Sequence, residues 1–385
     1  MQMLLDKINT FCDKNIAYFV KFDEDRKSGT ENLFVSGKDP VKIYQNALDY
    51  LNGEMKAYMK NYEEIPLFIT YDFIDEIFPD IHIMRSKWPE IAFILPEQTF
   101  KEKIVREEKP SYVKNFDIID GELSIEIDDA INRIKNGELL QIVISKRFDL
   151  SDFDVMNAIK NFIFNDKSLY VYYYKFGDLQ IIGSSPENIF TVFDKKIIIN
   201  PIAGTRKRGD TGQEDIKLEM ELKKDEKELL EHRMLVDLAR NDLGKICEPG
   251  SVNVVKSMEI QKFASVQHLV SSVEGRLINN NPGDILKAVF PAGTVSGAPK
   301  KRAIYLINQY EKIPRGPYAG AVGVMGNEHM DMALAIRTLF KNKDENYTQA
   351  GAGIVKDSIA INEVNEMHSK ALTVIGGLYE KNIDD

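Results

Sequence analysis

Two pairs of glutamates, each with a spacing of three residues, are the side chains in this sequence most suited to holding a metal ion. Glu228 and Glu231 lie in one predicted helix, and Glu363 and Glu366 lie in the last one. Residues three apart share a helix face, so each pair presents two carboxylates side by side. If the two helices meet, a hard cation such as Mg²⁺ would offset the repulsion. Taken alone, the spacing is more typical of a solvated helix surface.

Three glycine-rich turns could bring backbone N–H groups close to an anionic ligand. They are residues 201–205 (PIAGT), 291–299 (PAGTVSGAP) and 351–353 (GAG). Small residues permit close approach, and clustered N–H groups suit a carboxylate or a phosphate. None of the turns has the Gly-Lys-Ser/Thr ending of a Walker-type phosphate loop, so we do not expect a nucleotide site. Ordinary turns have a similar composition, and this alternative stays open at this point.

Three further side chains could serve either a site or the structure. Arg337 lies in an apolar run that we expect to be a strand, where it could pair with a substrate carboxylate or a structural one. His268 could transfer a proton near neutral pH, although a lone histidine is more often structural. Lys370 follows Glu366 by four residues, as in an ordinary helical ion pair.

The elements that must position these residues follow from the spacing of apolar side chains. Helical spacing predicts helices over residues 123–140, 214–240, 299–310 and 362–375. Runs rich in Tyr, Val and Ile predict strands over residues 67–71, 91–95, 141–148, 169–175, 179–183, 188–200, 252–262 and 269–277. We expect a β meander over residues 318–325, 330–339 and 346–353. Because no regular βαβ repeat occurs, the pattern predicts an α+β fold with large, mostly antiparallel sheets flanked by helices.

Composition narrows the classes of partner. A formal net charge of −10 argues against nucleic acid, and an anionic substrate would need local cations, a metal ion or backbone N–H groups. No apolar run reaches membrane-spanning length, and the N-terminus does not resemble a signal peptide, so we expect a cytoplasmic protein without a membrane partner. Cys12 and Cys247 offer neither a disulfide framework nor a metal knuckle.

A series of segments resembles the chorismate-utilising enzymes, a family that includes anthranilate synthase, aminodeoxychorismate synthase, isochorismate synthase and salicylate synthase. The segments are 141–147 (QIVISKR), 183–187 (GSSPE), 201–206 (PIAGTR), 231–242 (EHRMLVDLARND), 267–270 (QHLV), 290–300 (FPAGTVSGAPK), 316–323 (GPYAGAVG) and 351–355 (GAGIV). They occur in the family's order, which is more specific than any single motif. The resemblance implies the family's chorismate-binding fold, with residues 1–110 as a short N-terminal region packing on the core and residues 111–385 as the catalytic domain.

Within this resemblance, the glutamate pairs correspond to a magnesium site. Glu231 and Glu366 resemble the Mg²⁺ ligands, and Glu228 and Glu363 resemble a supporting shell. The resemblance implies that the metal holds the ring carboxylate of chorismate. Lys370 matches a lysine near the metal and the substrate.

The resemblance also assigns proton-transfer groups and a binding site for the enolpyruvyl carboxylate. Glu187 resembles the general acid that protonates the departing C4 hydroxyl, a role that burial would favour by keeping the carboxyl group protonated. His268 resembles the histidine associated with later proton removal and loss of pyruvate. The resemblance also places Gln141 and Thr294 among the catalytic residues. The positions expected to line the pocket or hold the enolpyruvyl carboxylate are Gly204, Thr205, Thr294, Tyr318, Arg337, Gly351, Ala352 and Gly353.

Two positions indicate which reaction of the family to expect. Water-adding members carry a lysine at the position of Gln141, and a glutamine cannot act as that base. Many aminodeoxychorismate synthases use a covalent lysine at the position of Ala203, and alanine cannot form such an adduct. The resemblance therefore implies amination at C2 with loss of the C4 hydroxyl, followed by elimination of pyruvate to give anthranilate.

The source of ammonia and two alternatives complete the expectations. No glutaminase triad accompanies these motifs, so we expect a separate glutamine amidotransferase subunit and a hetero-oligomer. Aminodeoxychorismate synthase is the alternative enzyme, if such an enzyme works without the lysine. A non-catalytic chorismate-binding paralogue would be expected to lack a metal carboxylate or the acid, yet Glu187, Glu231 and Glu366 are all present.

Overall fold

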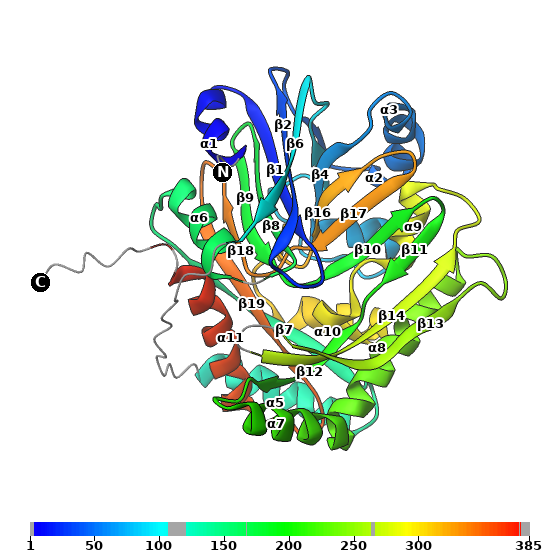
Figure 1. Cartoon of the computed structure of the whole chain (residues 1–385). Helices are drawn as coiled ribbons and strands as arrows, with labels where there is room; N and C mark the ends of the chain where they lie inside the picture. Colours follow the sequence, from blue (N-terminus) through cyan, green and yellow to red (C-terminus); the bar gives the residue numbers. More distant parts are fainter. Residues whose placement is uncertain (1–3, 107–120, 167, 263–265, 377, 379–385) are drawn as a thin grey trace, which may run out of the picture.

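Two large antiparallel sheets with helices around them make up the structure, which confirms the predicted α+β class (Figure 1). The computed structural model describes residues 4–106, 121–166, 168–262, 266–376 and 378. The nine-stranded sheet has the order β15 (Gly297–Ala298), β7 (Gln141–Asp149), β19 (Asn346–Ile354), β18 (Thr338–Lys341), β9 (Leu179–Ser185), β8 (Tyr170–Phe176), β1 (Asn15–Phe22), β2 (Ser28–Ser36) and β6 (Gln98–Val105).

The second sheet has ten strands. Its order is β12 (Ile202–Lys207), β14 (Val266–Arg276), β11 (Lys196–Ile199), β10 (Asn188–Phe193), β17 (His329–Leu334), β16 (Ala321–Met325), β4 (Ile65–Ile69), β5 (Ile91–Phe93) and β3 (Val41–Ile43), with β13 (Asn253–Lys262) paired on β14. Residues before 107 thus supply three strands to each sheet. The domain boundary that the sequence predicts at residue 110 lies outside the described residues.

Helices cover the outer surfaces and one end of the sheets. The α-helices are α1 (Leu4–Lys7), α2 (Ala47–Tyr50), α3 (Lys56–Met59), α4 (Ile74–Ile77), α5 (Gly121–Lys135), α6 (Val155–Asn165), α7 (Gly212–Lys224), α8 (Glu226–Gly244), α9 (Pro282–Val289), α10 (Lys300–Tyr310) and α11 (Ala360–Ile375). Short turns of other helix types are η1 (Ile8–Phe11), η2 (Leu51–Met55), η3 (Tyr71–Phe73) and η4 (Gly293–Val295). Figure 1 shows α5, α7, α8 and α11 together at the lower end of the molecule. No helix in the described ranges is both long and apolar enough to cross a membrane.

The main hydrophobic core lies between the two sheets. Tyr170, Tyr172 and Tyr174 of β8 point into it, whereas Val171 and Tyr173 belong to a second core on the other face, with α1 and α6. Successive side chains of a strand point to opposite faces, so β8 is buried on both sides. This double burial explains why its sequence is a continuous apolar run.

A third hydrophobic core covers one face of β7 and β19, and several of the predicted site residues lie on the opposite face. Ile142 and Ile144 of β7 and Ala352 and Ile354 of β19 pack there against α5, α10 and α11. The residues that alternate with them, and therefore face the other side of the sheet, are Gln141, Val143, Ser145, Gly351 and Gly353. The sheet thus turns several predicted site residues in the same direction.

The single helix predicted over residues 214–240 is wrong, because two helices meet there. Asp225 separates α7 from α8; its backbone is extended, with φ −74° and ψ 103°. Its carboxylate accepts a hydrogen bond of 3.2 Å from the N–H of Glu228 and caps α8. Apolar residues keep their helical spacing across the break, so periodicity alone could not reveal it.

The β meander predicted over residues 318–353 is also wrong in its pairing. β16 and β17 form a hairpin in the ten-stranded sheet, and β18 and β19 form one in the nine-stranded sheet. The chain crosses between the sheets at residues 335–337, where Arg337 has a φ of +51°. Residues 188–200, predicted as one strand, likewise form a hairpin that turns at Asp194 and Lys195. Each run is predicted as a single strand because apolar residues continue on both sides of the turn.

Candidate active site

Glu187 lies in the turn between β9 and β10, and its carboxyl group is paired with Thr294. The Thr294 hydroxyl donates to Glu187 Oε1 over 2.6 Å. Burial raises the pKa of Glu187 to about 7, although this hydrogen bond and the positive charge of Lys370 both act to lower it. A carboxyl group that is half protonated at neutral pH can donate a proton to a leaving group.

The turn itself is held by local hydrogen bonds. The Ser185 hydroxyl donates to the carbonyl of Glu187 over 3.1 Å and accepts its N–H over 3.3 Å. The N–H of Leu334, at the end of β17, donates to the same carbonyl over 3.0 Å. The backbone of Glu187 is therefore held by residues of β9 and β17, and Thr294 holds its carboxyl group.

His268 lies in β14 opposite β12, and its ring is neutral at physiological pH. Its Nδ1 is 3.2 Å from the carbonyl oxygen of Gly204. A carbonyl only accepts, so Nδ1 carries the hydrogen and Nε2 is the basic nitrogen. Burial lowers the pKa of His268 to about 4, and the charges of Arg337 and Arg26 act in the same direction. The ring can therefore accept a proton.

Gly204 brings β12 close to α8. A Cβ at this position would lie 3.3 Å from Glu228 Oε2 and 3.0 Å from a methyl carbon of Leu269, and its φ of +76° also favours glycine. Thr205 follows in β12, and its side chain lies outside the described part of the chain.

The four glutamates predicted as the metal site lie on α8 and α11 and repel one another. Burial raises the pKa of Glu231; Lys227 opposes this, and the charges of Glu228 and Glu363 add to it. Burial also raises the pKa of Glu363, and the charge of Glu366 adds to that shift. A divalent cation would relieve such repulsion, so the carboxylates present suit Mg²⁺.

Positive side chains pair with three of these carboxylates in the structure, and Lys227 Nζ lies 3.9 Å from Glu231 Oε1. Arg206 Nη1 donates to Glu228 over 3.1 Å and also pairs with Asp225. Lys370 Nζ is 2.7 Å from Glu366. Within the described residues, no group of three or more Asp, Glu, His or Cys side chains is arranged to hold a metal ion. The magnesium site therefore stays a prediction that rests on charge and helix placement.

Two glycines of β19 allow larger side chains to approach its inner face. A Cβ on Gly351 would lie 2.6 Å from the hydroxyl oxygen of Tyr318, and one on Gly353 would lie 2.8 Å from Gln141 Nε2. Burial raises the pKa of Tyr318 well above its usual range, so the phenol stays a hydrogen-bond donor. Gln141 Oε1 is buried without a hydrogen-bond partner among the described residues. These groups form a surface of polar atoms and exposed backbone that could hold a carboxylate.

Several predicted site residues are linked to this surface, although not all by their side chains. Lys370 Nζ donates to the carbonyl of Gly351 over 2.9 Å. Arg337 lies between β17 and β18 rather than within a strand, and its Nη1 is 3.9 Å from Asp166 Oδ1. Its charge still acts on His268. Ala352 points its side chain into the helical core, so only its backbone can face a ligand.

Sequence reasoning missed the buried polar residues behind the site. Arg315 is 2% exposed and Glu311 is 8% exposed, and the two side chains pair directly. Their spacing of four residues, just before the segment 316–323, was the available signal.

A cavity of about 40 Å³, lined in part by Glu187, Thr294 and Leu238, also adjoins the acid on the side of α8. It has room for one or two water-sized molecules.

Known proteins share this sequence pattern. The family model described as chorismate binding enzyme matches residues 120–376. Anthranilate synthase component 1 of Neisseria meningitidis serogroup B is 46% identical over 253 residues, which cover 64% of this chain and 52% of that protein. Anthranilate synthase component 1 of Saccharolobus solfataricus is 38% identical over 365 residues, covering 86% and 85%. The chain spans about half the length of relatives such as the Neisseria protein.

Solved structures share the fold. Anthranilate synthase component I from Streptococcus pneumoniae aligns with a TM-score of 0.73 at 32% identity, covering 94% of this chain and 92% of that one. The menaquinone-specific isochorismate synthase of Escherichia coli aligns with a TM-score of 0.76 at 17% identity, covering 98% and 92%. At that identity the second likeness shows the fold alone.

Proposed function

The chain belongs to the chorismate binding enzyme family, and on this premise we propose that it converts chorismate and ammonia to anthranilate and pyruvate, as component I of an anthranilate synthase. The observation that carries the proposal is the combination of Glu187, a buried acid with a pKa of about 7, with His268, a neutral base, and Gln141, which cannot activate water. The names of the relatives support the same product. Anthranilate formation would place the enzyme in tryptophan biosynthesis.

In the first step, ammonia adds to C2 of chorismate while the C4 hydroxyl leaves as water. Glu187 supplies the proton that converts the hydroxyl into a better leaving group, and both ring double bonds shift as the C4–O bond breaks. Free ammonia is already a nucleophile, so the amide at Gln141 has only to orient it. No residue has to remove a proton from the nucleophile before it attacks.

In the second step, the C2 proton is lost and the enolpyruvyl group leaves from C3 as pyruvate. His268 Nε2 is the group proposed to accept the C2 proton, because the ring is neutral and its Nδ1–H is held by Gly204. Formation of the aromatic ring makes this elimination favourable.

Substrate binding needs positive charge and N–H donors, because chorismate is a dianion and the chain has a net charge of −10. We assign the enolpyruvyl carboxylate to Arg337, the Tyr318 hydroxyl and the backbone at residues 351–353. We assign Mg²⁺ to Glu231 and Glu366, with Glu228 and Glu363 around them. The bound cation would supply the charge that neutralises the ring carboxylate.

Purified protein should make anthranilate from chorismate, Mg²⁺ and an ammonium salt at alkaline pH. Anthranilate fluorescence and pyruvate release, measured together, should rise in equal amounts. An aminated product that keeps its enolpyruvyl group would instead identify aminodeoxychorismate synthase. No turnover and no aminated product at any ammonium concentration would favour a non-catalytic paralogue.

Ammonia is proposed to come from a glutamine amidotransferase subunit, as the "component 1" of the relatives' names suggests. With glutamine as the only nitrogen source, the isolated chain should be inactive. Adding the amidotransferase subunit should restore anthranilate formation. Glutamine-dependent activity of the isolated chain would contradict this part of the proposal.

A further inference from the structure

A single buried guanidinium, Arg315, lies behind several parts of the candidate site. Arg315 follows α10 and is 2% exposed. Its Nε and Nη2 donate to the two carboxylate oxygens of Glu311 over 2.8 and 2.7 Å, which is the bidentate geometry of a strong pair. The pair is enclosed by protein, so its remaining donors must find partners within the fold.

Those remaining donors bind the backbone of two site segments. Nη1 donates to the carbonyl of Val295 over 2.6 Å, and Val295 follows Thr294, the partner of Glu187. Nη2 donates to the carbonyl of Val143 over 2.9 Å, in the strand that begins with Gln141. One planar group therefore connects η4, which carries the threonine that pairs with Glu187, to β7, which begins with Gln141.

Glu311 connects the same guanidinium to a second residue of β7. Its Oε1 accepts hydrogen bonds from the N–H of Ser145 over 2.8 Å and from the Ser145 hydroxyl over 2.7 Å. Ser145 is paired across the sheet with Gly351 of β19. Glu311 therefore helps to hold the residue of β7 that faces Gly351.

Two tyrosine rings flank the guanidinium. Its central carbon lies 4.7 Å from the ring centre of Tyr71 and 5.6 Å from that of Tyr318, distances at which a cation is attracted to an aromatic face. The N–H of Tyr71 donates to the carbonyl of Gly316 over 2.6 Å, two residues before Tyr318. Arg315 therefore also orients the tyrosine proposed to bind the substrate carboxylate.

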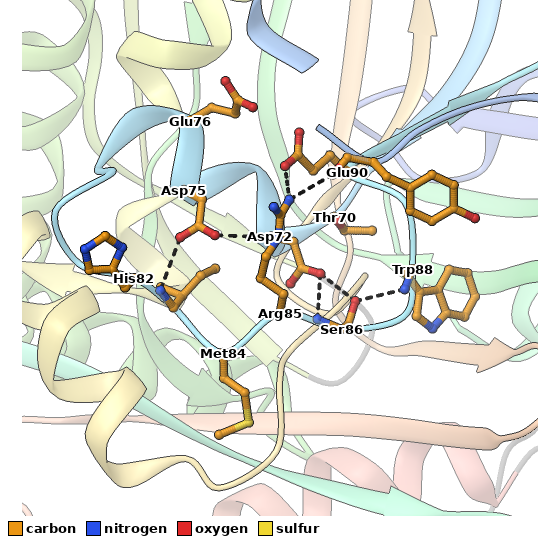
Figure 2. A network of polar contacts seen from close by, with 12 residues as sticks. Thr70, Asp72, Asp75, Glu76, His82, Met84, Arg85, Ser86, Trp88 and Glu90 are labelled. Atoms are coloured by element: carbon orange, nitrogen blue, oxygen red, sulfur yellow. Dashed lines mark hydrogen bonds and ion pairs between the residues drawn. The ribbon is translucent and has the colours of Figure 1, made fainter. Parts of the chain in front are cut away.

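The segment that carries Tyr71 is fixed by its own polar network, shown in Figure 2. Asp72 accepts hydrogen bonds from the N–H and the hydroxyl of Ser86 over 2.8 and 2.6 Å. The Ser86 hydroxyl in turn accepts the N–H of Trp88 over 3.1 Å, and Figure 2 shows Ser86 between these two residues. This network fixes the segment whose Tyr71 N–H binds Gly316, next to Arg315.

We propose that Arg315 is a positioning residue that holds Thr294, Gln141 and Tyr318 in a fixed mutual arrangement for the reaction. The proposal rests on the proposed function. Stability alone is a poor explanation for the pair, because taking two charges out of water costs as much as their attraction returns, and apolar residues would serve equally well. Only a planar fork can reach two carbonyls and a carboxylate together, so lysine should not replace it.

The test compares Arg315→Lys with Arg147→Lys. Arg147 in β7 is the control, because it too pairs with a glutamate and an aromatic ring: it donates to Glu345 over 2.8 Å, and its central carbon is 3.8 Å from the ring centre of Tyr347. Among the described residues, these contacts of Arg147 include no candidate site residue. Both enzymes are assayed with chorismate, Mg²⁺ and ammonium, well below their melting temperatures. We expect Arg315→Lys to lose on the order of 10- to 100-fold in kcat/KM, with a raised KM for chorismate. Arg147→Lys should keep both parameters within about twofold.

Equal kinetic parameters for the two variants, with a lowered melting temperature in each, would overturn the proposal. If Arg315→Lys does not fold, Glu311→Gln replaces it, since it removes one of the two carboxylate oxygens that hold the guanidinium and keeps an oxygen that can accept from Ser145. A raised KM in Glu311→Gln supports the proposal, and unchanged kinetics overturn it. If the wild-type enzyme makes no anthranilate, that result contradicts the proposed function and leaves the positioning role to a binding measurement. Calorimetric binding of chorismate to the same variants then still tests the positioning role.

Discussion

At the scale of single residues, the pKa of the acid Glu187 is subject to opposing influences. Burial raises this pKa to about 7, although the Thr294 hydrogen bond and the charge of Lys370 both act to lower it. The catalytic form is the protonated one, so activity should fall as the pH rises through about 7. The hydrogen bond can be removed by substitution.

Thr294→Val removes the hydrogen bond that stabilises the ionised carboxylate. The pKa of Glu187 should therefore rise, and the fall in activity should move to higher pH. The measurement is kcat against pH, with the rate expressed per concentration of free NH₃ because ammonia itself titrates. A shift to lower pH, or no shift, would contradict the role of Glu187 as the acid paired with Thr294.

Glu187→Gln should abolish turnover but stabilise the fold at neutral pH. In the wild type, the unfolded carboxyl group ionises above about 4.5, whereas the folded one stays protonated up to about 7. The wild type should therefore lose about 3 kcal/mol of stability relative to the variant as the pH rises from 4.5 to 7, with no further change above it. Urea denaturation at several pH values measures this difference. The exposed change Glu248→Gln is the control, and it should show no such trend.

At the scale of elements, the predicted strands and helices are correct where the chain stays in a single strand or helix throughout a buried run. The sequence placed Gln141, Gly351 and Gly353 correctly in strands, and the structure shows that these strands, β7 and β19, are neighbours. The pattern failed at Asp225 and at Arg337, where the chain changes helix or sheet within a buried run. Apolar spacing reports that a residue is buried, but not against which element, because pairing depends on distant parts of the chain. Arg315 was missed for the same reason, since its partners lie in segments far away in the sequence.

The two glycines of β19 should respond differently to an added methyl group. In Gly353→Ala, the new Cβ meets only the flexible end of Gln141, so the melting temperature should change little while kcat/KM falls. In Gly351→Ala, it meets Tyr318 and, at 3.0 Å, the carbonyl of Ile144, so stability should fall by about 1–3 kcal/mol as well. Thermal unfolding and steady-state kinetics of both variants check this. Equal losses of stability would show that the inner face of β19 is not as described.

At the scale of the whole molecule, the fold brings together carboxylates that are far apart in the sequence. Glu231 on α8 interacts electrostatically with Glu363 on α11, and also with Glu228 on its own helix. The net charge of −10 adds a general repulsion against an anionic substrate. Binding of a cation at these helices should therefore both stabilise the fold and favour binding of the anionic substrate.

Millimolar Mg²⁺ should raise the melting temperature of the wild type, even without substrate. A ligand present at 100 times its Kd adds about 2.7 kcal/mol of stability. Glu366→Gln should lose most of this increase and its Mg²⁺-dependent turnover, whereas Glu248→Gln should retain both. An equal response of all three proteins to Mg²⁺ would refute the assignment of the metal to these carboxylates.

The most direct test of the account asks which nucleophile adds to chorismate. The enzyme is incubated with chorismate, Mg²⁺ and ¹⁵N-ammonium in ¹⁸O-labelled water, and the products are identified by mass spectrometry. We predict ¹⁵N-labelled anthranilate, an equal amount of pyruvate, and no product with ¹⁸O on the ring. A hydroxylated ring product that carries ¹⁸O would contradict the account, because it would show that water is activated at Gln141.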